Sequence, residues 1–191
     1  MARNPAQNEN CRSRYTKESV KDALLEMMQH SPFQRITVTQ LCQRIGISRS
    51  TFYLHFYDTY DVLDALIEDI LENTSGLIDH VLYPGCASCT HSLCHQFQMY
   101  PRYRPLVFDE TASQRILEKL SREHRSSFTT YLTKNSRLTR EQADALFYFQ
   151  INGCLVTNRM MLEANKENWP EIQTVIDQYI KGGLEFHLAQ R

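Results

Sequence analysis

The positions of apolar side chains follow the period of an α-helix along most of this chain. A first amphipathic helix is predicted over residues 16–29, and a later one begins at Asp58 or Thr59 and is expected to reach about residue 80. The clearest break in the middle of the chain is Tyr83-Pro84-Gly85. Further helical patterns follow it at about 86–100, 101–109, 111–134, 139–166 and 169–188. Because the sequence has no strand-like alternation, the pattern predicts an all-α protein.

Two short helical patterns separated by a glycine lie between the first and the later helix, in residues 36–56. Thr37 is suited to cap the first of them, and Gln40 falls at the capping-box position. Gly46 stands where the chain leaves that helix through a left-handed conformation. Ser48 is suited to cap a second helix, predicted from Arg49 to about residue 55. This arrangement is typical of a helix-turn-helix that inserts its second helix into the DNA major groove.

The second short helix has an apolar side and a polar side. Phe52 and Phe56 lie four residues apart and are expected to face inward. Arginine can bind guanine through two hydrogen bonds, and serine or threonine can contact a base edge, whereas tyrosine and histidine suit phosphate contacts. Ordinary solvated side chains are the alternative, but the turn glycine and the two caps favour DNA binding. The side chains left outside are Arg49, Ser50, Thr51, Tyr53 and His55.

The segment TVTQLCQRIGISRSTFYLHF resembles the hallmark of the TetR/AcrR family of repressors, T-V-x-x-[IL]-A-x-x-A-G-[VI]-S-x-x-T-F-Y-x-[HY]-F. Cys42 and Ile45 stand where alanine is usual in that family. The resemblance covers residues 14 to about 72. It implies a three-helix DNA-binding domain over 14–60 and a helical ligand-binding and dimerisation domain over 61–191, linked by the helix at 59–80, with about nine helices in all. From the resemblance and from neighbouring positions in the sequence, the residues expected to face DNA are Thr37, Thr39, Ser48, Arg49, Ser50, Thr51, Tyr53, His55 and Thr59.

The chain departs from the family just after this segment. The family usually has a lysine that opens the next helix and touches phosphate, whereas this chain has Thr59 and Tyr60 there. A hydroxyl can donate a hydrogen bond to phosphate but releases no counterion. We therefore expect DNA binding that depends less steeply on salt than in a lysine-bearing relative.

The distribution of charge agrees with a DNA-binding N-terminal part. Residues 1–60 hold eight Lys or Arg against five Asp or Glu, a formal charge of +3, and the other residues hold thirteen against seventeen, a charge of −4. The polar residues 1–13 are predicted to be a disordered arm. Arg12, Arg14 and Lys17 are candidates to reach phosphates or a minor groove, and a merely solvated tail is the alternative.

Several classes of protein are excluded by what the sequence lacks. No run of 18 apolar residues exists and the N-terminus has no apolar signal segment, so we expect neither a membrane span nor secretion. A cytoplasmic protein with cysteine thiols is the expectation. No catalytic triad or carboxylate pair can be placed, so no enzyme and no cofactor are expected.

A cluster of cysteine and histidine residues follows the central break, in CASCTHSLCH. On a helix, several of these side chains could share one zinc or copper(I) ion, and a CxxC at a helix N-terminus favours a reactive thiolate. The spacing matches no closed zinc motif, and the cysteines do not share one helical face. A metal or thiol-redox sensor therefore stays open beside incidental polar residues. The candidate ligands are Cys86, Cys89, His91, Cys94 and His95.

The last two helical patterns have wide apolar stripes, which can pair with their copies across a two-fold axis. In the resembled family such helices form the dimer, and the second domain encloses a pocket for a small molecule. Buried amides such as Gln150 and Asn158 need partners, either a ligand, a dimer contact or backbone. The candidate pocket residues are Tyr100, Tyr103, Phe108, Phe128, Tyr131, Phe147, Gln150 and Asn152.

The sequence thus indicates a homodimeric, sequence-specific DNA-binding regulator. A repressor released from a palindromic operator by a small-molecule effector is the first hypothesis. A metal- or thiol-redox-responsive regulator that uses the Cys86–His95 cluster is one alternative. A protein of the same fold that acts as a co-activator or partner of another protein is the other.

Overall fold

Proline and capping residues define where the helices of this chain begin. A computed structural model describes residues 5–72, 100–164 and 168–190. Within them the chain forms eight α-helices and two short 3₁₀ helices and no strand, which confirms the all-α prediction. The described residues separate into two compact units, residues 1–70 and 71–191.

The first helix is longer than the sequence predicted. α1 runs Pro5–Met28, so residues 5–13, expected to be a disordered arm, are helical. Proline is well tolerated in the first turn of a helix, where its missing N–H leaves no hydrogen bond unmade, and no further proline or glycine follows before Met28. Polar composition alone suggested disorder, but nothing in these residues breaks a helix.

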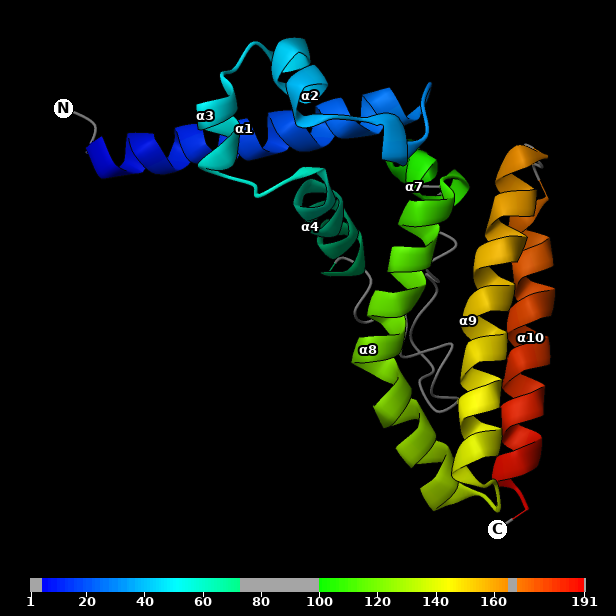
Figure 1. Ribbon diagram of the computed structural model, residues 1–191. Coiled ribbons are helices and arrows are strands. Elements are labelled where there is room, and N and C mark those ends of the chain that lie inside the picture. Colours follow the sequence, from blue (N-terminus) through cyan, green and yellow to red (C-terminus); the bar gives the residue numbers. More distant parts are fainter. Residues whose placement is uncertain (1–4, 73–99, 165–167, 191) are drawn as a thin grey trace. The chain divides into compact units, whose positions relative to one another are not determined.

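Three further helices complete the first unit, which Figure 1 shows in blue and cyan. After the 3₁₀ turn η1, Phe33–Arg35, come α2, Val38–Ile45, α3, Arg49–Tyr53, and α4, Thr59–Glu72. The apolar stripes predicted for α1 and α4 are buried here. The largest fully buried side chains of this unit are Leu24, Phe33, Leu41, Phe52, Leu63, Leu66 and Ile67.

A partly buried ion pair joins the first and fourth helices. Lys21 of α1 is only 7% exposed, and its Nζ lies 2.6 Å from Oδ2 of Asp69 on α4 and 2.6 Å from Oε1 of Glu18. Val62, Leu63, Leu66, Ile67 and Ile70 of α4 are also buried. The first unit therefore ends after Ile70, later than the predicted boundary at residue 60, because most of α4 supplies its core.

The second unit is built on two long antiparallel helices. η2, Pro101–Tyr103, leads into the short α7, Arg104–Phe108, followed by α8, Glu110–Asn135, α9, Arg140–Glu163, and α10, Trp169–Leu188. Asp109 caps α8, and a Thr139–Gln142 capping box opens α9. Arg159 of α9 donates through Nε and Nη2 to the Val107 carbonyl and through Nη2 to Ser113 Oγ, which ties α7 and α8 to α9.

Two sequence predictions fall partly or wholly outside the described residues. The cysteine–histidine cluster at 86–95 lies there, as does the expected end of the linking helix near residue 80. In the part that the structure does describe, no helix is long and apolar enough to cross a membrane.

Candidate nucleic-acid interface

The turn between α2 and α3 has the geometry that its sequence predicted. Thr37 Oγ1 accepts from the backbone N–H of Gln40, while Gln40 Oε1 accepts from the N–H of Thr37 at 2.8 Å, which completes the capping box. Gly46 ends α2 with φ of 72°, a left-handed conformation that only glycine adopts at little cost. These local bonds set the direction in which the chain enters α3.

Hydroxyl groups gather at the first turn of α3. Ser48 Oγ accepts from the backbone N–H of Thr51 at 3.0 Å and lies 2.7 Å from Ser50 Oγ and 2.9 Å from Thr51 Oγ1. Ser48 is therefore occupied as the N-cap, as predicted. Ser50 is exposed and Thr51 is half-buried, so Ser50 is the more accessible hydroxyl of the two.

Arg49 lies along the outside of α3 against Tyr53, one turn further on. Its Nη2 donates to the Tyr53 hydroxyl oxygen at 3.3 Å, and its guanidinium carbon is 5.9 Å from the centre of the tyrosine ring. This hydrogen bond raises the pKa of Arg49, so the group stays charged. The Tyr53 oxygen accepts in this bond, which leaves its own O–H free to donate to a phosphate.

Cys42, which stands where the resembled family has alanine, is a core residue here. It is 4% exposed, and its Sγ lies 3.9 Å from the carbonyl oxygen of Ser48. Burial raises the pKa of the Cys42 thiol, against the smaller lowering effect of Arg49. The thiol is thus protonated and donates a weak hydrogen bond to the residue that caps α3, as a small core residue.

The N-terminal half of α1 runs beside the end of α3 (Figure 1). Ser13 Oγ and His55 Nδ1 are 3.5 Å apart, and His55 is half-buried. This contact holds the histidine ring between α1 and the end of α3. Arg12 and Arg14, within one turn of Ser13, are exposed.

Two exposed side chains beside α3 were not singled out by sequence reasoning. Leu54 is 80% exposed and Tyr57 is 84% exposed. The backbone N–H of Tyr57 donates to Asp61 Oδ2 at 2.9 Å, and the N–H of Asp61 donates to Asp58 Oδ1 at 2.9 Å. Asp58 thereby opens α4, and Thr59 is half-buried as its first residue. The Asp58–Asp61 spacing was the available signal that the chain turns here and leaves Tyr57 outside.

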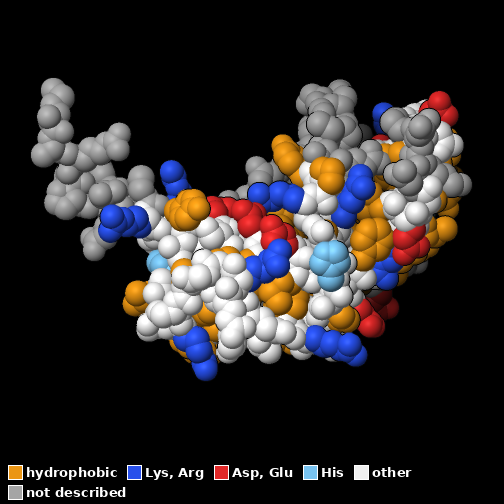
Figure 2. All heavy atoms as spheres, turned by 90° about the horizontal axis from the view of Figure 1, so that it is seen from above, with side chains coloured by type: hydrophobic (Ala, Val, Ile, Leu, Met, Phe, Trp, Pro, Cys, Tyr) orange, Lys and Arg blue, Asp and Glu red, His pale blue; other side chains and the backbone are white. Residues whose placement is uncertain are grey.

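Charged side chains are spread out in the view of Figure 2. Lys and Arg side chains lie around a surface that is largely neutral and polar, and do not form one dense patch. Arg44, one of the exposed basic residues of the first unit, is paired with Glu26, its Nη2 being 2.8 Å from Oε2. On the face shown in Figure 2, contact with an anionic partner therefore depends on a few individual arginines and hydroxyls more than on one dense basic patch.

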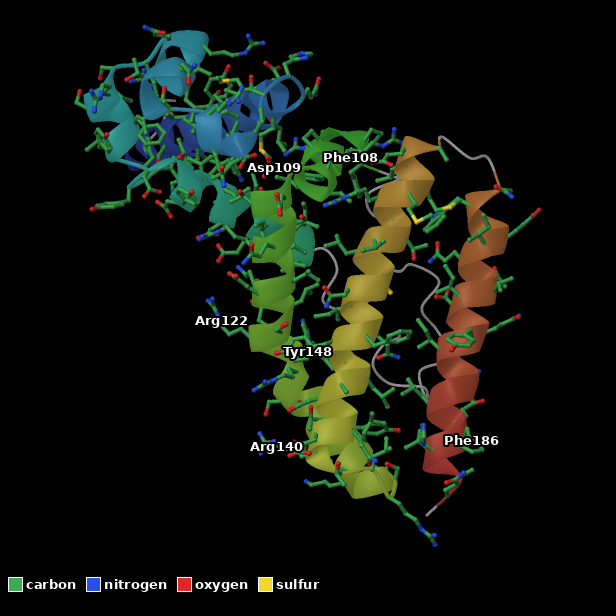
Figure 3. The ribbon with its side chains drawn as sticks, turned by 45° about the vertical axis from the view of Figure 1, so that its right-hand side comes forward. Phe108, Asp109, Arg122, Arg140, Tyr148 and Phe186 are labelled. Carbon is green, nitrogen blue, oxygen red and sulfur yellow. The ribbon has the colours of Figure 1, made fainter. Side chains whose placement is uncertain are left out.

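The residues predicted to form an effector pocket do not come together as one group. Phe128 and Phe147 contact each other between α8 and α9, with ring centroids 5.6 Å apart, whereas Asn152 is exposed and donates to the Tyr148 carbonyl. Gln150 is 7% exposed, and its Oε1 finds no hydrogen-bond partner in the described part of the chain. Of the remaining candidates, Tyr103 and Tyr131 are half-buried and Tyr100 is exposed. Phe108, labelled in Figure 3, is also exposed.

No group of three or more His, Cys, Asp or Glu side chains that could hold a metal ion occurs in the described ranges. The buried amide of Asn158, a second polar candidate, donates through Nδ2 to the Cys154 carbonyl at 2.9 Å. Of the partners that the sequence left open for this amide, which were a ligand, a dimer contact or backbone, it therefore binds backbone.

Known proteins that resemble this chain are DNA-associated regulators. No family model matches it. It is 35% identical over 78 residues to the nucleoid occlusion factor SlmA of Photorhabdus laumondii, which covers 40% of this chain and 39% of that protein. It is 37% identical over 59 residues to the class D tetracycline repressor protein of Escherichia coli, which covers 31% of this chain and 27% of the repressor. Those relatives are TetR-family regulators, and this chain matches well under half of their length.

Proposed function

We propose that this chain, a relative of the TetR-family regulators, binds a palindromic DNA operator as a homodimer and regulates transcription by doing so. The observation that carries the proposal is α3 itself. It is a short helix fixed by Gly46 and Ser48 that presents Arg49, Ser50 and Tyr53 to solvent, none of which its own packing requires. Side chains of these types, on the second helix of such a motif, read bases and hold phosphates in the major groove.

The roles of the individual side chains follow from their partners. Arg49 is the candidate to read a guanine base, because its guanidinium group can donate to O6 and N7 of guanine at the same time. Tyr53 keeps a free O–H for a phosphate, and Thr37 and Thr39 are exposed at the start of α2, where the first helix of such a motif crosses the backbone. Arg12 and Arg14 at the N-terminal end of α1 add charge beside α3.

Dimerisation is proposed through exposed apolar side chains of α9 and α10. One apolar stripe of α9 includes Phe147 and Leu155, which are buried within the unit. A second face of α9 is exposed instead, with Phe149 at 67%, Val156 at 56% and Met160 at 62%. On α10, Val175 is 65% exposed, Tyr179 73% and Phe186 61%. Apolar stripes of this extent on adjoining helices fit a two-fold, self-complementary interface.

Repression released by a small effector is the form of regulation that we infer. Gln150 supports an effector site between α8 and α9, since its buried Oε1 has no donor among the described residues and lies one turn from Phe147. An effector would shift the operator-binding equilibrium only by its differential affinity for the two conformers.

The experiment that tests DNA binding uses the DNA upstream of the gene that encodes this chain, in which a palindrome is sought. Fluorescence anisotropy would compare the palindrome with single-base variants for the wild type and for Arg49→Ala. We expect Arg49→Ala to lose about 1–3 kcal/mol on the palindrome and to discriminate less at one base pair. Lys134→Ala removes an exposed positive charge from the second unit and is the control. If Arg49→Ala keeps both affinity and base preference, the groove assignment is wrong.

A further inference from the structure

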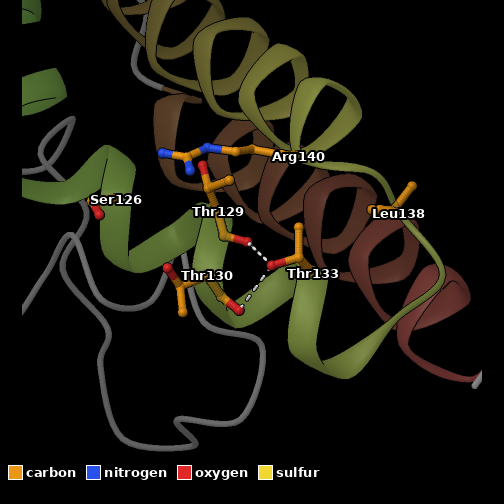
Figure 4. Close-up of a pocket in the computed structure, with 6 residues that line it drawn as sticks. All are labelled: Ser126, Thr129, Thr130, Thr133, Leu138 and Arg140. Atoms are coloured by element: carbon orange, nitrogen blue, oxygen red, sulfur yellow. Dashed lines mark hydrogen bonds between the residues drawn. The ribbon is translucent and has the colours of Figure 1, made fainter.

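A polar cavity lies at the far end of the α8–α9 pair, where the chain turns from one helix into the other. It has a volume of about 330 Å³, which is in the range of small-molecule sites. Figure 4 shows its lining, and none of the residues predicted to bind an effector belongs to it. The lining residues are Ser126, Thr129, Thr130, Thr133, Leu138 and Arg140.

Among the described residues, the lining carries one positive charge, that of Arg140, and no negative one. The side chain of Arg140 makes no hydrogen bond or ion pair within the described residues, although Glu141 is its neighbour in sequence. Arg140 is the first residue of α9, so its charge adds to the positive end of that helix. The carboxylate of Asp144 accepts from Thr129 Oγ1 at 2.7 Å and lies 4.0 Å from Arg125 Nε. An anion beside Arg140 would offset charge that the described residues leave unbalanced.

The hydroxyl groups divide into donors and acceptors. Thr129 gives its proton to Asp144, and Thr133 gives its proton to the carbonyls of Thr129 and Thr130, as the dashed lines in Figure 4 show for Thr133. Each therefore offers only lone pairs to a ligand. The hydroxyls of Ser126 and Thr130 form no side-chain hydrogen bond within the described residues, so their protons are available.

We propose that this cavity binds a small hydroxylated anion, either a phosphate ester or a carboxylate of a polyol. The anionic group lies against Arg140, Ser126 and Thr130, which together supply a charged fork and two O–H donors. The hydroxyl groups of the ligand donate to Thr129 and Thr133. A simple inorganic anion can use only the arginine and the two O–H donors. A neutral polyol can use only the oxygen acceptors of Thr129 and Thr133. This proposal does not rest on DNA binding.

Isothermal titration calorimetry on the full chain tests the proposal with four probes. Glycerol 3-phosphate and gluconate carry both charge and hydroxyls, inorganic phosphate carries charge alone, and glycerol carries hydroxyls alone. We expect one or both hydroxylated anions to bind with Kd below about 1 mM, and the two controls to bind at least about tenfold more weakly. Binding of glycerol 3-phosphate alone identifies a phosphate ester as the ligand, and binding of gluconate alone identifies a carboxylate. Failure of both, or equal binding of inorganic phosphate, overturns the proposal.

Matched variants locate the binding. Arg140→Ala is expected to weaken the better probe by about tenfold or more, and the double change Ser126→Ala, Thr130→Val by about threefold or more. These residues are exposed, and circular dichroism checks that the helices persist. Arg122→Ala removes another exposed arginine of the same unit outside the cavity, which Figure 3 shows pointing outward, and should leave binding unchanged. Equal affinities of the wild type and Arg140→Ala would place the ligand elsewhere and refute the assignment.

Discussion

Single residues of the first unit hold its helices at fixed positions by hydrogen bonds and charge. Lys21 is the clearest case, because a buried ammonium is costly unless it is paired. Burial lowers the pKa of Lys21, but the hydrogen bonds to Asp69 and Glu18 outweigh it, so the pKa is raised above its ordinary value. The pair therefore stabilises the folded state.

Lys21→Met should destabilise the chain by about 1–3 kcal/mol at pH 7, because charge-assisted hydrogen bonds between α1 and α4 are lost. Since the folded pKa is raised, the stabilisation is fully present below the unfolded pKa of 10.5 and is lost as the pH rises through the folded value. Urea unfolding across this pH range measures the difference between the two proteins. Lys17→Met changes an exposed lysine of the same helix and should show little effect at any pH.

Thr59 stands where related chains place a phosphate-binding lysine. Thr59→Lys should steepen the plot of log binding constant against log salt by about 0.9 for each added phosphate contact. Anisotropy titrations at several salt concentrations give the slope. Ser127→Lys adds the same charge at an exposed position of α8 and should leave the slope as it was.

At the scale of elements, the caps decide where the short helices begin. Ser48→Ala should cost about 1 kcal/mol, because the N–H of Thr51 loses its acceptor at the start of α3. The midpoint of urea unfolding measures the loss. Ser50→Ala removes a neighbouring hydroxyl that caps no backbone group and should cost less. Equal losses for the two variants would mean that the hydroxyl cluster, and not the cap, carries the stability.

Local signals explain which elements could be predicted from the sequence. Thr37, Gly46 and Ser48 act within a few residues of themselves, so the turn and both caps were predictable. The extension of α1 was missed because its polar residues resemble a tail, and only the helical contact of Ser13 with His55 distinguishes the two. The candidate site at Arg140 was not predicted because its hydrogen-bonding capacity depends on which acceptors the hydroxyls of Thr129 and Thr133 bind. One of those acceptors, Asp144, lies on another helix than the two threonines.

The same limit holds for the two faces of α9. Apolar residues surround much of this helix, so periodicity could not separate Phe147, which is buried, from Phe149, which is exposed. Only the packing of α8 against one side of α9 decides which stripe is core. The sequence alone therefore could not tell which apolar stripe of α9 is available to another copy.

At the scale of the whole molecule, the exposed stripes of α9 and α10 predict the oligomeric state. Phe149→Glu with Phe186→Glu should give monomers, because four carboxylates without partners, two from each copy, would be buried in the interface. Sedimentation equilibrium measures the mass. Phe108→Glu changes an exposed phenylalanine outside both stripes and should leave the dimer intact.

Monomers of that double variant should also bind the palindrome much more weakly than the wild type, since only one recognition helix then contacts DNA at a time. A chain that stays dimeric despite both changes would place the interface on other residues. A monomeric chain with unchanged operator affinity would show that dimerisation is not needed for binding.

The contact between Arg49 and Tyr53 affects how much conformational entropy is lost when an operator is recognised. A free arginine side chain samples many rotamers, and ordering it at an interface costs about 0.5–1.5 kcal/mol of conformational entropy. Here the phenol oxygen already holds the guanidinium along α3 before any DNA arrives. Tyr53 thus lowers the entropic penalty of base reading in addition to any phosphate that it binds, and Tyr53→Phe would remove this preorganisation while retaining the ring.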